Sequence, residues 1–177
     1  MKFCVITDIH NQPAPDLCFS SRFVPATGVI RLALNELCGR ADLTGEALHG
    51  HLFEGGGMAD AVGVLGENMN SGCIGLGYSA GGAAIWQAAA VGLSFTAIFC
   101  VSSTRLREQA SITTPNHVFF GAEDQGKPSA EWLTSVPNRA TVLDAVGHSY
   151  YLDAASDGCR ETRLRISEDL RRCGWPL

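Results

Sequence analysis

The chain has 177 residues, of which 46% are hydrophobic and 18% are charged, a balance typical of one globular domain with one core. Its formal net charge is −5, and its 13 lysines and arginines form no long run, which argues against a surface for nucleic acid. The sequence shows neither an apolar segment of membrane-spanning length nor the cationic start and cleavage site of a secretion signal.

The cysteines indicate a reducing compartment. They number seven, have no C-x-x-C spacing and stand mostly inside apolar segments, where cysteines behave as small buried hydrophobes. We therefore expect a cytoplasmic protein. No metal and no other cofactor is expected. Its expected partner is a small-molecule substrate, and a homodimer is possible.

The first half of the chain predicts one strand, two helices and one ambiguous segment. Residues 2 to 7 form an apolar strand, and a proline-marked loop follows. Thr27 can cap a helix that ends near Gly39, and a second helix is expected from Met58 to Met69. Residues 40 to 57 are the hardest to interpret: Leu48, His49, His51 and Phe53 hint at a strand before the break at Gly55, Gly56 and Gly57.

The inward face of each of these helices follows from the spacing of its apolar residues. The first helix is expected to bury Ile30, Ala33, Leu34 and Leu37, and the second Val62, Leu65 and Met69.

The second half of the chain alternates strands with helices. Apolar strands are predicted over residues 73 to 78, 95 to 101, 117 to 120 and 140 to 145. Helices are predicted over residues 82 to 91, after Pro128, and from about residue 159 to 173, where Arg171, Arg172, Gly174 and Pro176 give a stop signal. This alternation predicts an α/β domain, residues 1 to 177, with a mostly parallel sheet and helices on both faces.

One serine stands in a pattern that favours chemistry. Gly77, Ser79 and Gly81 form G-x-S-x-G between a predicted strand and a predicted helix. A serine at so sharp a turn has its hydroxyl pushed outward, and its neighbours two residues away must lack bulk. The first N–H groups of the helix, including that of Ala80, then point toward the oxygen that becomes negative in acyl transfer.

A carboxylate and a histidine follow two later strands. Asp124 comes after residues 117 to 120, and His148 comes after residues 140 to 145. The carboxyl ends of parallel strands meet at one edge of a sheet, where open α/β sheets place their ligand sites. Asp124 is preferred over Glu123 because its shorter side chain loses less rotamer freedom when it orients an imidazole. His117 begins a strand and should point away from that edge.

The order Ser, Asp, His and the segments around these residues resemble the α/β-hydrolase superfamily, and within it small dienelactone-hydrolase-like members. The likeness covers roughly residues 73 to 150. It implies a compact α/β-hydrolase fold, and a chain of 177 residues has little room for a lid domain. It also implies a serine hydrolase with Ser79 as nucleophile, His148 as general base and Asp124 as orienting acid. Dienelactone hydrolases carry a cysteine at the elbow, so Ser79 shifts the expected substrate toward small esters or thioesters.

The resemblance also suggests where the rest of the site lies. The oxyanion would bind the N–H of Ala80 and a second N–H from the loop after the first strand, that of Ile9 or His10, since no H-G-G-G motif is present. Substrate contacts are expected from Tyr78, Arg105 and Tyr150. Trp86 and Trp132 could also line the pocket.

Two other functions stay open on the sequence alone. Asp8 and His10 resemble the D-x-H metal motif of calcineurin-like metallophosphoesterases, although the other metal ligands of that family have no match in register. His49 and His51 could share one strand face as a metal pair, but no third ligand is evident. The scaffold could also be a binding module without catalytic activity.

Overall fold

The computed structural model describes residues 2 to 68 and 72 to 174. Its centre is a six-stranded sheet in which every neighbouring pair of strands is parallel, in the order β2-β1-β3-β4-β5-β6. The strands are β1 (Phe3–Ile6), β2 (Val29–Leu32), β3 (Cys73–Tyr78), β4 (Phe95–Val101), β5 (Asn116–Gly121) and β6 (Arg139–Leu143). β3 and β5 are buried along their whole length, as expected for a sheet covered on both faces.

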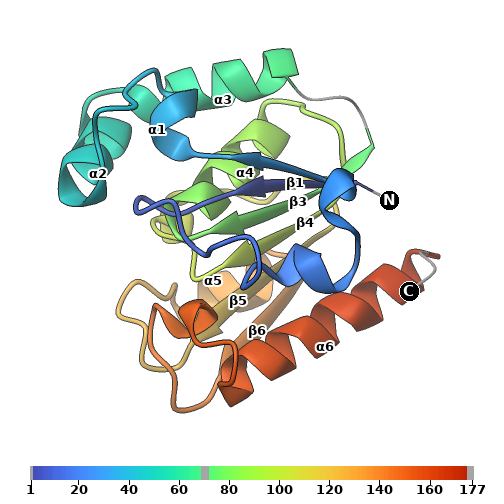
Figure 1. Cartoon of the computed structure of the whole chain (residues 1–177). Coiled ribbons are helices and arrows are strands. Elements are labelled where there is room, and N and C mark those ends of the chain that lie inside the picture. The colour runs from blue at the N-terminus through green and yellow to red at the C-terminus, as the bar shows by residue number, and fades with distance from the viewer. Residues whose placement is uncertain (1, 69–71, 175–177) are drawn as a thin grey trace.

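Helices cover both faces of the sheet (Figure 1). The α-helices among the described residues are α1 (Leu34–Leu37), α2 (Gly45–Glu54), α3 (Gly57–Asn68), α4 (Ala80–Ala90), α5 (Ala130–Ser135) and α6 (Asp157–Arg172). The short 3-10 helices are η1 (Phe19–Arg22), η2 (Ala26–Gly28), η3 (Leu106–Glu108) and η4 (Tyr150–Leu152). No lid domain is inserted in the described residues.

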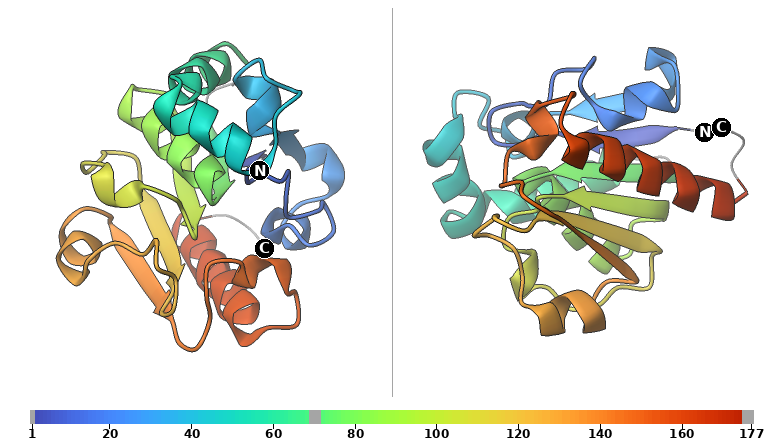
Figure 2. Two further views of the ribbon diagram at one scale, coloured as in Figure 1. Left: turned by 90° about the vertical axis from the view of Figure 1, so that its left-hand side faces the viewer. Right: turned by 90° about the horizontal axis from the view of Figure 1, so that it is seen from below.

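Two apolar clusters hold these layers together. The larger cluster joins one sheet face to α1 through α5, with Trp86 and Leu65 fully buried in it. The smaller joins the other face to η1 and α6 through Phe19, Ile166 and Leu170. α6 crosses this second face in Figure 2, right. Ser156 caps its N-terminus by accepting a hydrogen bond from the Cys159 N–H at 3.2 Å, and Arg171 and Arg172 occupy its last turn.

Two predicted elements in the first half are wrong. The segment from residue 29 to 32 is strand β2, so Ile30 lies in the sheet and the helix after it spans only one turn. The ambiguous segment is helix α2, in which Leu48 and Leu52 are buried one turn apart while His49 and His51 lie on helical rather than strand backbone. Met69 and Pro176 lie outside the described residues.

The strand order positions the candidate site. The chain moves from β1 to β2 on one side, then returns past β1 to β3 and continues to β4 on the other side. Open α/β sheets bind ligands at the carboxyl ends of strands where the order reverses in this way. That point lies between β1 and β3, and Figure 2, left, looks onto the edge where these two strands end.

Candidate active site

The turn between β3 and α4 has strained backbone geometry. Ser79 has φ 50° and ψ −120°, a conformation that costs on the order of 1–3 kcal/mol in a residue other than glycine. Hydrogen bonds hold this conformation in place: the Ser79 N–H donates to the Val101 carbonyl at 2.9 Å, and the Ser79 carbonyl accepts from the Gly82 N–H at 3.1 Å. Strain of this kind collects at functional sites.

The two glycines of the motif are required by close backbone contacts. A Cβ on Gly77 would lie 2.5 Å from the carbonyl oxygen of Gly81. A Cβ on Gly81 would lie 2.5 Å from the carbonyl oxygen of Ile6, at the end of β1. Both distances are far below an ordinary van der Waals contact, so the elbow can lie this close to β1 only with glycine at these positions.

Ser79, His148 and Asp124 meet at this edge of the sheet. The Oγ of Ser79 lies 3.1 Å from Nε2 of His148, and Nδ1 of the same ring lies 2.9 Å from Oδ2 of Asp124. The residues come from the turns after β3, β5 and β6, so the sheet brings together positions up to 69 residues apart. Both distances fall in the hydrogen-bonding range.

The three side chains differ in their contact with water. The Asp124 side chain is 2% exposed, and its second oxygen accepts from the Gly126 N–H at 2.8 Å. The imidazole of His148 is 38% exposed, and residue Ser79 is 6% exposed. An ionised carboxylate only accepts hydrogen bonds, so Nδ1 of His148 carries the proton toward Asp124 and Nε2 is left to accept from Ser79.

The loop after β1 is organised by a buried carboxylate. Asp8 is 4% exposed and accepts hydrogen bonds at 2.8 Å from the N–H groups of His10 and Gln12 and from the hydroxyl of Tyr151. The N–H of His10 is therefore committed to Asp8, which corrects its expected place as an oxyanion donor. Ile9 remains the candidate from this loop, and Ala80 remains the candidate as the first residue of α4.

The same contacts argue against the metal-site alternative for this loop. The oxygens of Asp8 are taken up by Tyr151, His10 and Gln12. Among the described residues, no group of three or more His, Cys, Asp or Glu side chains is arranged to hold a metal ion.

Four aromatic residues expected at the pocket lie in the core instead. Tyr78 is fully buried, its hydroxyl accepts from the Phe19 N–H at 2.9 Å, and burial raises the pKa of its hydroxyl well above the ordinary value. Tyr150 is 6% exposed, and its hydroxyl lies 2.9 Å from that of Thr162. Trp86 and Trp132 pack against each other, and each indole N–H donates to a backbone carbonyl.

Arg105 lies close to the elbow but is partly engaged. Its guanidinium carbon lies 5.0 Å from the centre of the Phe53 ring, and its Nη1 lies 3.9 Å from Glu108. The preceding residue, Thr104, is a part of the site that the sequence does not predict: its hydroxyl lies 3.0 Å from the Oγ of Ser79. No motif marks Thr104, because the shape of the turn after β4 decides where it points.

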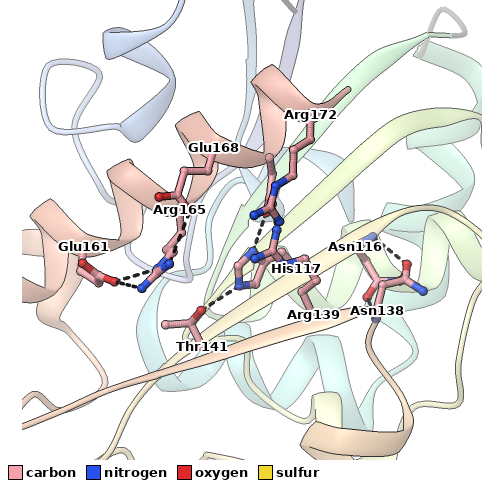
Figure 3. A network of polar contacts seen from close by, with 10 residues as sticks. Asn116, His117, Asn138, Arg139, Thr141, Glu161, Arg165, Glu168 and Arg172 are labelled. Carbon is pink, nitrogen blue, oxygen red and sulfur yellow. Dashed lines mark hydrogen bonds and ion pairs between the residues drawn. The ribbon is translucent and has the colours of Figure 1, made fainter. Parts of the chain in front are cut away.

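A second series of hydroxyl, imidazole and carboxylate joins β5 and β6 to α6; Figure 3 labels Thr141 and His117, which carry its hydroxyl and imidazole. Nε2 of His117 lies 2.8 Å from the Thr141 hydroxyl, and Nδ1 lies 2.6 Å from Asp169 on α6. Arg139 pairs with the same carboxylate. The His117 side chain is 3% exposed, and burial lowers the pKa of its imidazole although Asp169 acts in the opposite direction. His117 thus points away from the candidate site, as expected.

Three hollows of the surface lie elsewhere. A groove of about 480 Å³ runs beside α6 and is lined by residues that include Arg163 and Arg171. Two smaller hollows, of about 260 and 250 Å³, lie beside β2 and near the start of β5. None of the three is lined by Ser79, Asp124 or His148. Among the described residues, no helix is long and apolar enough to cross a membrane.

Comparison with known proteins identifies the fold. No model of a protein family matches the chain, and no curated protein matches its sequence. Solved structures do match, among them alpha/beta hydrolase domain-containing protein 10 from mouse, with a TM-score of 0.66 and 15% identity over 97% of this chain and 90% of that one.

Two further solved structures that match the chain are also named as esterase or hydrolase-like proteins. The esterase domain of a Rhodothermus marinus protein gives a TM-score of 0.60 and 12% identity over 97% of this chain and 86% of that one. The dienelactone hydrolase-like promiscuous phosphotriesterase P91, from metagenomic libraries, gives a TM-score of 0.62 and 17% identity over 98% of this chain and 84% of that one. The chain therefore has the α/β-hydrolase fold.

Proposed function

We propose that the chain is a serine hydrolase that cleaves a small ester or thioester through an acyl-enzyme. The observation that carries the proposal is the series from the Ser79 hydroxyl to Nε2 of His148 at 3.1 Å and from Nδ1 to Asp124 at 2.9 Å. The fold supports it, since several proteins that share the fold are named as hydrolases or esterases.

The first half of the reaction acylates the serine. Ser79 Oγ attacks the carbonyl carbon of the substrate while its proton passes to Nε2 of His148. The C=O π electrons move onto the carbonyl oxygen, which accepts hydrogen bonds from the N–H groups of Ala80 and Ile9. Asp124 holds the imidazole in the required tautomer and stabilises its charged form. Collapse of the intermediate returns the C=O bond, and His148 gives its proton to the departing alcohol or thiol.

The second half releases the acid. Water takes the place of the leaving group and attacks the acyl carbon while His148 accepts its proton. The bond between Ser79 Oγ and the acyl carbon then breaks, and the proton returns from His148 to Oγ. The half-exposed imidazole and the absence of a lid domain in the described residues favour small acyl groups that need no deep pocket.

Hydrolysis of p-nitrophenyl esters of increasing acyl length tests the proposal. Wild-type protein should hydrolyse the shortest esters fastest. Ser79→Ala should lose activity to the background, because loss of the nucleophile costs about 10⁶-fold in well-studied enzymes, whereas Ser111→Ala, at an exposed serine, should be unaffected. Ester hydrolysis that survives Ser79→Ala would contradict the proposal. Phosphatase activity on p-nitrophenyl phosphate that needs Mn²⁺ and survives the same change would favour the metal alternative.

A further inference from the structure

The turn after β4 is attached directly to the elbow. The Thr104 N–H donates to the Ser79 carbonyl at 3.2 Å, and the Ser79 N–H donates to the last residue of β4. The Ser102 N–H donates to the Phe119 carbonyl at 2.8 Å, which ties the start of the turn to β5. The backbone of this turn is therefore fixed from both sides.

The same turn has two residues in the left-handed region. Ser102 has φ 46° and Arg105 has φ 59°, and neither is a glycine. Such residues cost free energy, and they persist where the surrounding structure determines them. Between these two residues, the Thr104 hydroxyl lies 3.0 Å from Ser79 Oγ.

The direction of that hydrogen bond follows from counting protons. Nδ1 of His148 donates to Asp124, so Nε2 has no proton and accepts from the Ser79 hydroxyl. The single proton of Ser79 is thus committed to the imidazole. The hydroxyl of Thr104 must therefore be the donor to Ser79 Oγ.

We propose that Thr104 aims the nucleophile, a role that rests on the proposed function. The four directions around Ser79 Oγ are its Cβ, its proton toward His148, one lone pair that accepts from Thr104 and one remaining lone pair. Only the last is free to attack a carbonyl carbon. Two hydrogen bonds thus fix the rotamer of Ser79, so the attacking lone pair is oriented before the substrate arrives.

The same hydrogen bond acts again when the acyl group leaves. As the bond between Oγ and the acyl carbon breaks, electron density returns to Oγ, which then takes its proton from His148. A donor already directed at Oγ stabilises this charge without reorganisation. The proton of Thr104 itself is never transferred, so the overall balance of the reaction is unchanged.

Two variants separate the hydroxyl of Thr104 from its shape. Thr104→Val keeps the branched side chain and removes the donor, whereas Thr104→Ser keeps the donor and removes the methyl group. The readouts are the second-order rate constant for labelling by a fluorophosphonate probe, the burst and steady-state rates with p-nitrophenyl acetate, and the melting temperature.

The hydroxyl should decide the rates. Thr104→Val should lower the labelling rate constant and the steady-state turnover about fivefold to tenfold, as expected for one lost hydrogen bond. Thr104→Ser should stay within about twofold of wild type. The pH dependence of labelling should be the same in both variants as in wild type. The melting temperature of Thr104→Val should change little, because its shape is conserved.

Each other outcome overturns the proposal. Wild-type rates in Thr104→Val would show that the hydroxyl is not used. Rates in Thr104→Ser as low as in Thr104→Val, with a lower melting temperature, would show a packing role only. If wild-type protein is not labelled at all, the serine hydrolase assignment fails and takes this role with it, whereas normal labelling of wild type and Thr104→Val refutes the role of Thr104 alone.

Discussion

Replacing Gly81 by alanine should destabilise the protein, because the added Cβ clashes with backbone atoms beside the elbow. The added Cβ would lie 2.5 Å from the carbonyl oxygen of Ile6 and 2.8 Å from its carbonyl carbon, and it would also meet the carbonyl oxygen of Thr7. These are backbone atoms of β1 and the residue after it, so they cannot swing aside as the end of a side chain can. Relief to an ordinary contact of about 3.4 Å needs the two segments to separate by roughly 1 Å.

The expected cost is about 3 kcal/mol or more, at the upper end of overpacking in a tight core. For a chain of this length that corresponds to a fall in melting temperature of about 6–12 °C. Gly63→Ala is the matched control, because it lies inside α3 with nothing within 4 Å of its Cβ. It should stabilise the protein by up to about 1 kcal/mol through helix propensity.

Thermal unfolding followed by circular dichroism gives the melting temperature of both variants, and ester hydrolysis gives their activity. Movement of β1 from α4 also moves the Asp8 loop, so Gly81→Ala should lose activity at temperatures where it is still folded. Equal melting temperatures and activities for the Gly81 and Gly63 variants would refute the close approach of β1 and the elbow.

Three further predictions concern other parts of the molecule. Asp124→Asn should lower ester turnover by roughly 10³–10⁴-fold, as loss of the orienting acid does in serine proteases, because His148 then takes the wrong tautomer; turnover within tenfold of wild type would exclude this role. Burial lowers the pKa of His117 in the folded protein below its value in the unfolded chain. As pH falls below about 6.5, the unfolded chain therefore takes up a proton at His117 before the folded protein does, and the folded protein loses stability. Urea unfolding at pH 7.5 and 5.5 should therefore show a smaller loss on acidification in His117→Asn than in wild type, and an equal loss would contradict the assignment. Alkylation of the native protein should modify Cys173, the exposed cysteine, and spare Cys100, whose thiol pKa is raised to about 12 by burial; peptide mass spectrometry reports which thiols react, and fast native alkylation of Cys100 would contradict its burial.

The sequence predicts the parts of the fold that depend on local pattern. Continuous apolar segments bounded by turn residues predict β3, β4, β5 and β6 to within a residue or two. The glycines around Ser79 predict the elbow, because only a sharp turn between strand and helix needs such small neighbours. A parallel sheet then places the residues after its strands at one edge, which brings Asp124 and His148 into reach of Ser79.

The remaining features depend on tertiary contacts that leave no local pattern. Leu48 and Leu52 face the core at helical spacing, but the alternating histidines between them imitate a strand. Tyr78 was expected at the pocket, yet its hydroxyl finds the Phe19 N–H inside the core. Thr104 reaches Ser79 from a turn in which Ser102 and Arg105 adopt positive φ, a conformation that their residue types do not predict.

The proposed mechanism requires that one hydroxyl, that of Ser79, is activated among all the serines of the chain. Reaction of the native protein with a fluorophosphonate, followed by protease digestion and peptide mass spectrometry, locates the modified residue. One adduct is expected, on Ser79, and it should disappear in His148→Ala. An adduct on another serine, or equal modification of Ser79 when His148 is absent, would contradict it.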